Sequence, residues 1–234
     1  ALSPRFLAMA WDARGYHESD DYDGILRDED FVSDLLKVLD HFKIEKAHIV
    51  GLSMGVEIAI DFHDKHPERV KSLVFCDGST GDEVNAKEYL EAYLQSRLAP
   101  LKAGIEMKDV VQDWVPSLIA DNSSKAVTKE ATKSLLVLRK ESYVKSLERY
   151  AREANRGGKG HKFAKVKVPT LGIVGQHDRL TTPDMMQDLI GLITGAKLKV
   201  IKGAAHLPNI EQPDVFNGIL TAFLDEQNGS GTPK

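Results

Sequence analysis

Short apolar runs and amphipathic stretches alternate at both ends of the chain. The apolar runs predict strands at 6–11, 47–50, 70–75, 170–174 and 197–201. Apolar residues at helical spacing predict helices at 28–42, 56–66 and 213–224, and Thr182-Pro183 predicts the start of another. Strands and helices that alternate in this way predict an α/β fold, with a mostly parallel sheet and flanking helices.

The middle of the chain has a different pattern, because residues 81–162 carry helical spacing only. Helices are predicted there at 84–98, 107–119, 125–138 and 141–154, followed by a glycine-rich basic linker at 156–160. We therefore expect one α/β core, formed by residues 1–80 and 163–228, that an all-helical insertion at 81–162 interrupts. The polar tail 229–234 is expected to be disordered.

The composition excludes few classes of protein, but it narrows the choice of partners and of cellular compartment. The chain has 234 residues, of which 42% are hydrophobic and 28% charged, as in ordinary globular proteins. A net charge of −4 argues against a nucleic-acid partner. No apolar run approaches the roughly 18 residues of a membrane helix, so no membrane partner is expected. The single cysteine, Cys76, cannot form an internal disulfide and is expected to be buried, which agrees with a cytoplasmic protein.

The pentapeptide Gly51-Leu52-Ser53-Met54-Gly55 is the strongest chemical signal in the chain. It lies between the predicted strand 47–50 and the predicted helix 56–66. The pattern G-x-S-x-G in that context places a serine on a sharp strand-to-helix turn, where its hydroxyl is exposed to a base. We expect the two glycines to remove Cβ atoms that would collide in the turn. Ser53 is therefore the candidate nucleophile.

A serine nucleophile needs a base, and the base needs an orienting acid. Asp178 follows the predicted strand 170–174, and His206 follows the predicted strand 197–201. Since the carboxyl ends of parallel strands meet at one edge of a sheet, both residues are expected near Ser53. We interpret Asp178 as the acid and His206 as the base.

Each of these residues has another interpretation. Asp178 could cap a turn and His206 could be an ordinary loop histidine. His177 competes as the base, but neighbours at a strand exit point in different directions. Asp77 also stands at a strand exit and is the rival acid.

Other residues are candidates for metal or substrate binding. His63 and His66 lie three residues apart on a predicted helix, but no third ligand accompanies them, so no metal is expected. Leu52 and Leu207 adjoin the candidate nucleophile and base and are candidates for substrate contact. Trp114 either packs in the core of the insertion or faces the substrate.

Four segments together resemble the α/β-hydrolase family. They are Trp11–Tyr16, Gly51–Gly55, Gly175–Thr181 and Gly203–Asn209. Within the family the chain looks most like 3-oxoadipate enol-lactonases and related small esterases. The resemblance implies a serine hydrolase without a cofactor that acts on a small ester or lactone, with Ser53, Asp178 and His206 as the triad. It also implies that the Met54 backbone N–H belongs to the oxyanion hole and that residues 81–162 form a cap. A carbon–carbon bond hydrolase and a ligand-binding or catalytically impaired protein are the alternatives.

The resemblance also implies elements that this sequence does not contain. Family members begin with three more strands and a loop that supplies the second oxyanion donor. We expect that segment to come from a companion chain, from residues outside this sequence or from another protomer. An enol-lactone substrate is anionic, so a cationic cap residue should face the pocket, with Arg139, Arg149 and Arg152 as candidates.

Overall fold

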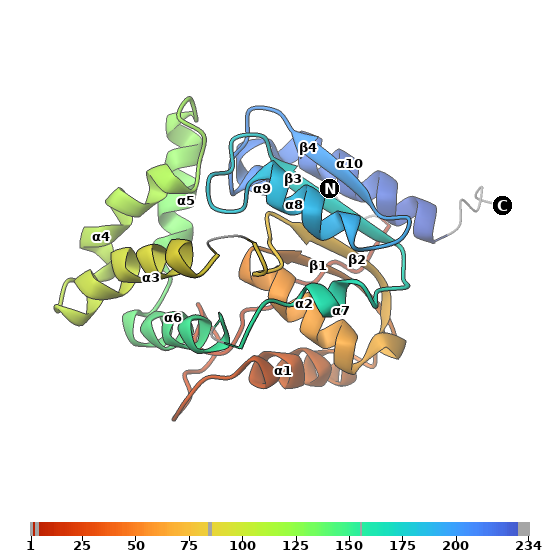
Figure 1. Cartoon of the computed structure of the whole chain (residues 1–234), viewed down its shortest axis with the longest axis horizontal. Coiled ribbons are helices and arrows are strands. Elements are labelled where there is room, and N and C mark those ends of the chain that lie inside the picture. Colours follow the sequence, from red (N-terminus) through yellow and green to blue (C-terminus); the bar gives the residue numbers. More distant parts are fainter. Residues whose placement is uncertain (1, 3–4, 84–85, 155, 229–234) are drawn as a thin grey trace.

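A parallel β-sheet forms the centre of the computed structural model, which describes residues 2, 5–83, 86–154 and 156–228 (Figure 1). Its strands are β1 (Ala47–Leu52), β2 (Val70–Cys76), β3 (Thr170–Gly175) and β4 (Lys197–Ile201). They lie in the order β1-β2-β3-β4, and each pairs in parallel with its neighbour. Four of the five predicted strands, the parallel arrangement and the α/β class are thereby confirmed.

Helices connect the strands and build the segment between β2 and β3. Ten α-helices are found in the described residues: α1 (Asp28–His41), α2 (Met54–Lys65), α3 (Ala86–Lys102), α4 (Met107–Trp114), α5 (Lys125–Leu136), α6 (Lys140–Ala154), α7 (Gly160–Phe163), α8 (Pro183–Gly191), α9 (Pro208–Glu211) and α10 (Pro213–Gln227). Two short 3₁₀ helices cover Pro67–Arg69 and Val115–Ser117. As predicted, Thr182 caps α8, since its hydroxyl accepts a hydrogen bond from the Met185 N–H at 3.3 Å. None of the helices described is both long and apolar enough to cross a membrane.

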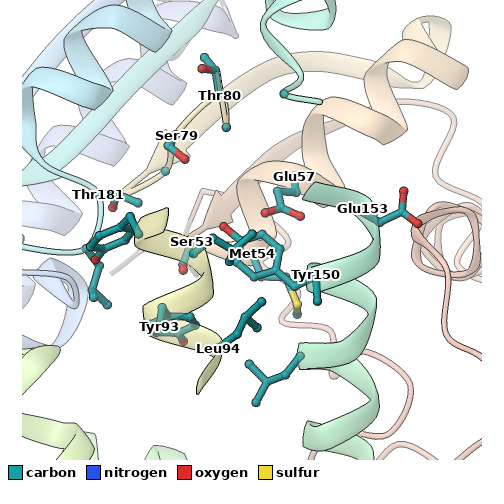
Figure 2. A pocket seen from close by; sticks show the side chains of 18 of the residues that line it. Ser53, Met54, Glu57, Ser79, Thr80, Tyr93, Leu94, Tyr150, Glu153 and Thr181 are labelled. Atoms are coloured by element: carbon teal, nitrogen blue, oxygen red, sulfur yellow. The ribbon is translucent and has the colours of Figure 1, made fainter. Parts of the chain in front are cut away.

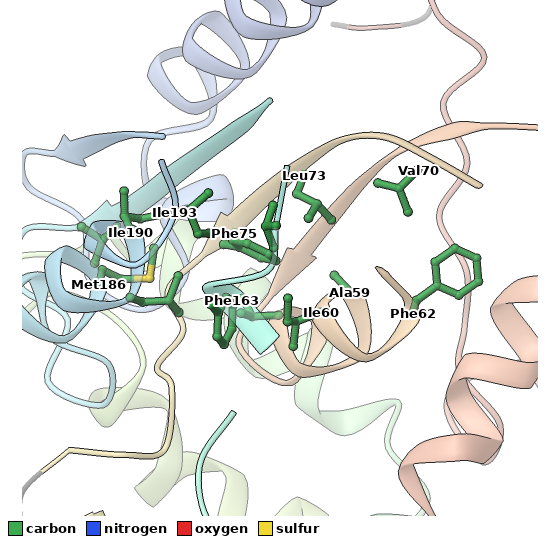
Figure 3. Packing of buried hydrophobic residues seen from close by; sticks show 14 of the residues in the cluster. Ala59, Ile60, Phe62, Val70, Leu73, Phe75, Phe163, Met186, Ile190 and Ile193 are labelled. Atoms are coloured by element: carbon green, nitrogen blue, oxygen red, sulfur yellow. The ribbon is translucent and has the colours of Figure 1, made fainter. Parts of the chain in front are cut away.

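Apolar residues cover both faces of the sheet, and β2 shows how. Leu73 and Phe75 point to the face that α2 and α8 cover, whereas Val74 and Cys76 point to the face that α10 covers. Figure 3 shows the first of these layers, with Ile60 of α2 and Met186 of α8 against the strands. All four β2 side chains are fully buried, which explains why this strand has a continuous apolar sequence. Cys76 is buried as expected and is a free thiol.

Residues 86–154 contain α3, α4, α5 and α6, and we call them the cap segment. Figure 1 shows these helices together at the left of the view, beside the sheet. They have an apolar core of their own, which includes Val111, Trp114 and Ala131. The helical character predicted here is observed, although α4 gives way to a 3₁₀ helix at Val115. The domain boundaries at 80 and 162 remain a prediction, and residues 84–85, 155 and the tail 229–234 lie outside the described residues.

The strand predicted at 6–11 is wrong, because these residues are irregular. Only Phe6 packs against the apolar layer on the α10 face, where its ring meets His48 edge-on at 6.4 Å. Leu7 and Met9 remain 79% and 41% exposed. A strand needs a neighbour to receive its backbone hydrogen bonds, and no described strand pairs with these residues. Strand β1 is consequently an edge of the described sheet, and its Val50 is 44% exposed.

Candidate active site

The three predicted site residues lie just beyond the carboxyl ends of three strands. Ser53 follows β1 directly, Asp178 lies three residues after β3, and His206 lies five residues after β4. Because β1 to β4 are all parallel, these exits share one edge of the sheet. The topology therefore gathers side chains that are far apart in the sequence.

Ser53 occupies a strained turn between β1 and α2. Its backbone has φ 53° and ψ −117°, a conformation that non-glycine residues rarely adopt. Gly51 is required by this turn, since a Cβ atom there would lie 2.1 Å from the Gly55 carbonyl oxygen. The same expectation for Gly55 is wrong, because a Cβ atom there meets nothing within 4 Å. Met54, the first residue of α2, has a backbone N–H that the helix cannot satisfy.

Asp178 and His206 form a buried hydrogen-bonded pair. His206 Nδ1 lies 2.8 Å from Asp178 Oδ2, and the two residues are 5% and 4% exposed. Asp178 also accepts hydrogen bonds from the Leu180 N–H at 2.8 Å, the Thr181 N–H at 3.2 Å and the Thr181 hydroxyl at 2.7 Å. Burial raises the pKa of Asp178, but the bonds from His206, Thr181 and Leu180 outweigh it and lower that pKa below the ordinary value. Asp178 is thus held as an anion that orients the imidazole, leaving Nε2 free for proton transfer.

Ser53 and His206 line the same cavity, of about 970 Å³. No hydrogen bond joins them in the part of the chain that the structure describes, and without substrate such contacts are often long. Figure 2 shows Ser53 with Tyr93 and Leu94 of α3 and Tyr150 of α6 around it. The residues that follow the strands therefore form one side of the cavity, and the cap segment forms the other side.

The other sequence candidates occupy different places. Leu52 and Leu207 line the cavity, as expected of substrate contacts. Trp114 is not among the lining residues, because it is buried in the cap core with its ring stacked beneath the Arg97 guanidinium at 4.5 Å. His177 is exposed, whereas its neighbour Asp178 is buried, so the two do point in different directions.

The three arginines that are candidates for the expected cationic residue of the pocket are mostly engaged elsewhere. Arg139 donates to the carbonyl oxygens of Gly15 and Ser19, and Arg152 donates to that of Leu26. Neither arginine lines the cavity. Arg149 does line it, but ion pairs with Asp28 and Glu57 neutralise its charge.

Arg97 of α3 is the functional candidate that the sequence analysis missed. It is 4% exposed, lines the cavity and forms no ion pair with any residue that the structure describes. One hydrogen bond, 2.9 Å to Ser117 Oγ, and the rings of Trp114 and Tyr93 hold its guanidinium. The signal that could have found Arg97 is its position along α3, because this helix lies between the cavity and the cap core.

Only one group of three potential metal-ligating side chains comes together in the described residues. It consists of Asp77, Asp178 and His206, with one polar atom from each within 4.8 Å of the others. The His206 Nδ1 in this group already shares a hydrogen with Asp178, as a base and its orienting acid do. Asp77, the rival acid, thus lies beside the pair rather than between its members.

Comparison with known proteins identifies the family and the fold. The family model for the alpha/beta hydrolase fold matches residues 1–213. The chain is 29% identical over 232 residues to the 2-hydroxy-6-oxononadienedioate/2-hydroxy-6-oxononatrienedioate hydrolase of Escherichia coli K12, a match that covers 94% of this chain and 76% of that protein. Among solved structures, a thermophilic esterase from Thermogutta terrifontis aligns with a TM-score of 0.81 and 24% identity, over 92% of this chain and 78% of the esterase. The enol-lactonase from Burkholderia xenovorans LB400 aligns with a TM-score of 0.78 and 24% identity, over 91% and 78% of the two chains. The family model matches most of the length of this chain, and the sheet edge carries a strained serine and a buried Asp–His pair. This chain therefore belongs to the alpha/beta hydrolase fold family.

Proposed function

We propose that this protein is a serine hydrolase that cleaves a small carboxylic ester or lactone with Ser53, His206 and Asp178. The observation that carries the proposal is the buried 2.8 Å Asp178–His206 pair, because its His206 lines the same cavity as Ser53 in the strained turn. The named hydrolase relatives support the reaction class.

In the proposed reaction His206 Nε2 takes the proton of Ser53 Oγ as that oxygen bonds to the acyl carbon. The Met54 N–H donates a hydrogen bond to the resulting oxyanion. The imidazolium then protonates the leaving group as its bond to carbon breaks. A water molecule, deprotonated by His206, attacks the acyl-enzyme, and the proton returns to Ser53 as the acid leaves. Asp178 holds the imidazole in one tautomer throughout and stabilises its charged form.

A fluorophosphonate probe tests this proposal, because it reacts only with an activated serine. We expect an adduct on Ser53 that disappears in Ser53→Ala and in His206→Ala, with ester hydrolysis reduced by a factor on the order of 10⁴ or more. Ser79→Ala is the matched control, since Ser79 also lines the cavity. An unlabelled wild-type protein that still binds small ligands would support a binding protein instead.

Hydrolysis of a carbon–carbon bond is the second candidate. The Escherichia coli relative carries the name of such a hydrolase, and the same three side chains could activate a water molecule for that reaction. A panel that contains esters, lactones and a vinylogous diketone of matched size separates the two. A kcat/KM for the diketone that exceeds those of all the esters would replace the ester assignment.

We further propose that the substrate carries a carboxylate, which Arg97 binds. A buried guanidinium without a carboxylate partner is costly, and a substrate carboxylate would restore the missing partner through paired hydrogen bonds. The Arg97 side chain also lines the cavity that Ser53 and His206 share.

Two esters of equal length test the role of Arg97, one with a free terminal carboxylate and one with a terminal methyl ester. We expect wild type to prefer the anionic ester and Arg97→Met to lower that preference about 10- to 100-fold, the effect of losing a charge-assisted bond of roughly 1.5–3 kcal/mol. Arg179→Met is the control, because Arg179 is an exposed arginine paired with Asp121. An unchanged preference in Arg97→Met would contradict the carboxylate assignment.

A further inference from the structure

Asp77 lies directly behind the proposed catalytic pair. It follows β2 immediately, is fully buried, and has a φ of 48°, in the left-handed region. One of its carboxyl oxygens lies within 4.8 Å of polar atoms of both Asp178 and His206. The chain therefore holds a second carboxyl group, in a strained backbone conformation, next to the proposed catalytic pair.

The hydrogen bonds of Asp77 are few. Its Oδ1 accepts one from the Gly175 N–H at 2.9 Å, and its Oδ2 is buried without a partner among the described residues. Asp178 accepts four hydrogen bonds. Glu211, the third buried acid nearby, accepts bonds from the Ala120 and Ala205 N–H groups and the Ser123 hydroxyl. Of the three acids, Asp77 has the weakest stabilisation for a negative charge.

The charges around Asp77 also disfavour its ionised form. In the described chain no lysine or arginine forms an ion pair with Asp77, Asp178 or Glu211, so only His206 can carry a compensating charge. Burial raises the pKa of Asp77 to about 9, against the Gly175 bond. Asp178 adds to the rise through its charge and through the contact of its side chain with the Asp77 carboxyl group, and the Glu211 charge adds less. The neighbouring Cys76 thiol adds no charge, since burial raises its pKa as well.

We propose that Asp77 is a positioning residue that is kept as a neutral carboxylic acid behind the Asp178–His206 pair, so that the site holds a single negative charge facing the imidazole. A second carboxylate this close would attract the proton that His206 takes from Ser53 and would oppose its return to the leaving group. The orphaned Oδ2 is the atom that carries the hydrogen. The catalytic part of this inference rests on the proposed function, but the charge state of Asp77 does not.

Spectroscopy reports the charge state on the wild-type protein. With ¹³C-labelled aspartate, we expect one carboxyl resonance to titrate near the pKa of about 9 that burial gives Asp77. At pH 7 the infrared intensity of protonated carboxyl groups should fall in Asp77→Asn and stay unchanged in Asp61→Asn, and the comparison with wild type separates Asp77 from Glu57, whose pKa burial also raises. Asp61 is the matched control because it is buried but paired with Lys159 and Lys162. Absence of the resonance from wild type, together with equal infrared intensity in wild type and Asp77→Asn, would overturn the proposal.

Stability gives a second, independent readout. The Asp77 carboxyl group ionises near pH 4 in the unfolded chain but only near pH 9 in the folded one, so its contribution to wild-type stability falls as pH rises between those values. The amide of the Asp77→Asn variant cannot titrate. The unfolding equilibrium constant of wild type relative to Asp77→Asn should therefore increase about tenfold per pH unit between about pH 5 and 8. Parallel pH dependences of the two proteins would overturn the proposal.

Activity against pH tests the catalytic part. We expect the kcat of wild type for ester hydrolysis to decline above about pH 9, where Asp77 ionises, and that decline to be absent from Asp77→Asn. Equal declines in both proteins would overturn the role of Asp77 in positioning. A wild-type protein that shows the infrared intensity of the Asp77 carboxyl group but no probe adduct on Ser53 would contradict the proposed function alone, while it supports the neutral state of Asp77.

Discussion

Two buried arginines line the same cavity and have opposite surroundings. Arg149 of α6 is 1% exposed and is paired with Asp28 and Glu57, which belong to α1 and α2. Arg97 of α3 is 4% exposed and has no acidic partner among the described residues. The first charge is used within the protein, to join the cap segment to the helices of the core. The charge of Arg97 is available to a molecule bound in the cavity.

The surroundings of Arg149 extend beyond one ion pair. Lys159 bridges Asp28 at 2.8 Å and Asp61 at 2.6 Å, and Lys162 reaches Asp61 at 2.6 Å. The basic linker predicted at 156–160 thus supplies a fixed counter-charge. Nearly every charge in this cluster has an opposite charge beside it, so the cluster favours one position of the cap segment over the core.

Removal of Arg149 should give the largest loss of stability. In Arg149→Met, the partly buried Asp28 and Glu57 lose one of their two cationic partners and keep Lys159, and we expect the free energy of unfolding to fall by about 1.5–3 kcal/mol. Urea denaturation measures this change. Arg179→Met is the exposed control and should change stability by less than about 1 kcal/mol. A loss below about 1 kcal/mol in Arg149→Met would mean that the cluster does not hold the cap segment.

Removal of Arg97 should have a much smaller effect on stability. Arg97→Met loses one hydrogen bond and two ring contacts, but it also relieves an unpaired buried charge. The two effects oppose each other, so we expect a change within about 1 kcal/mol in the same urea experiment. If Arg97→Met loses as much stability as Arg149→Met, Arg97 is a structural residue, and the comparison of the two arginines fails.

The core of the fold could be predicted from local pattern. The β2 run is apolar on both faces, and Gly51 and Ser53 form a turn that few other sequences allow, so strand, turn and helix were placed correctly. The residues after β3 and β4 were then brought to Ser53 by the geometry of parallel strands. The strand at 6–11 failed because pairing with a neighbour, which the local pattern does not report, decides whether an apolar run becomes a strand.

The sequence by itself determined the strand-turn-helix elements and the residue types that could do hydrolytic chemistry, because both depend on neighbours within a few positions. Only the tertiary structure decided the electrical state of the buried groups. Asp28 lies 121 residues before Arg149, and Gly175 lies 98 residues after Asp77. Such distant partners and the exclusion of water decide which arginine is neutralised and which aspartate keeps its proton. Both exist only after the chain has folded.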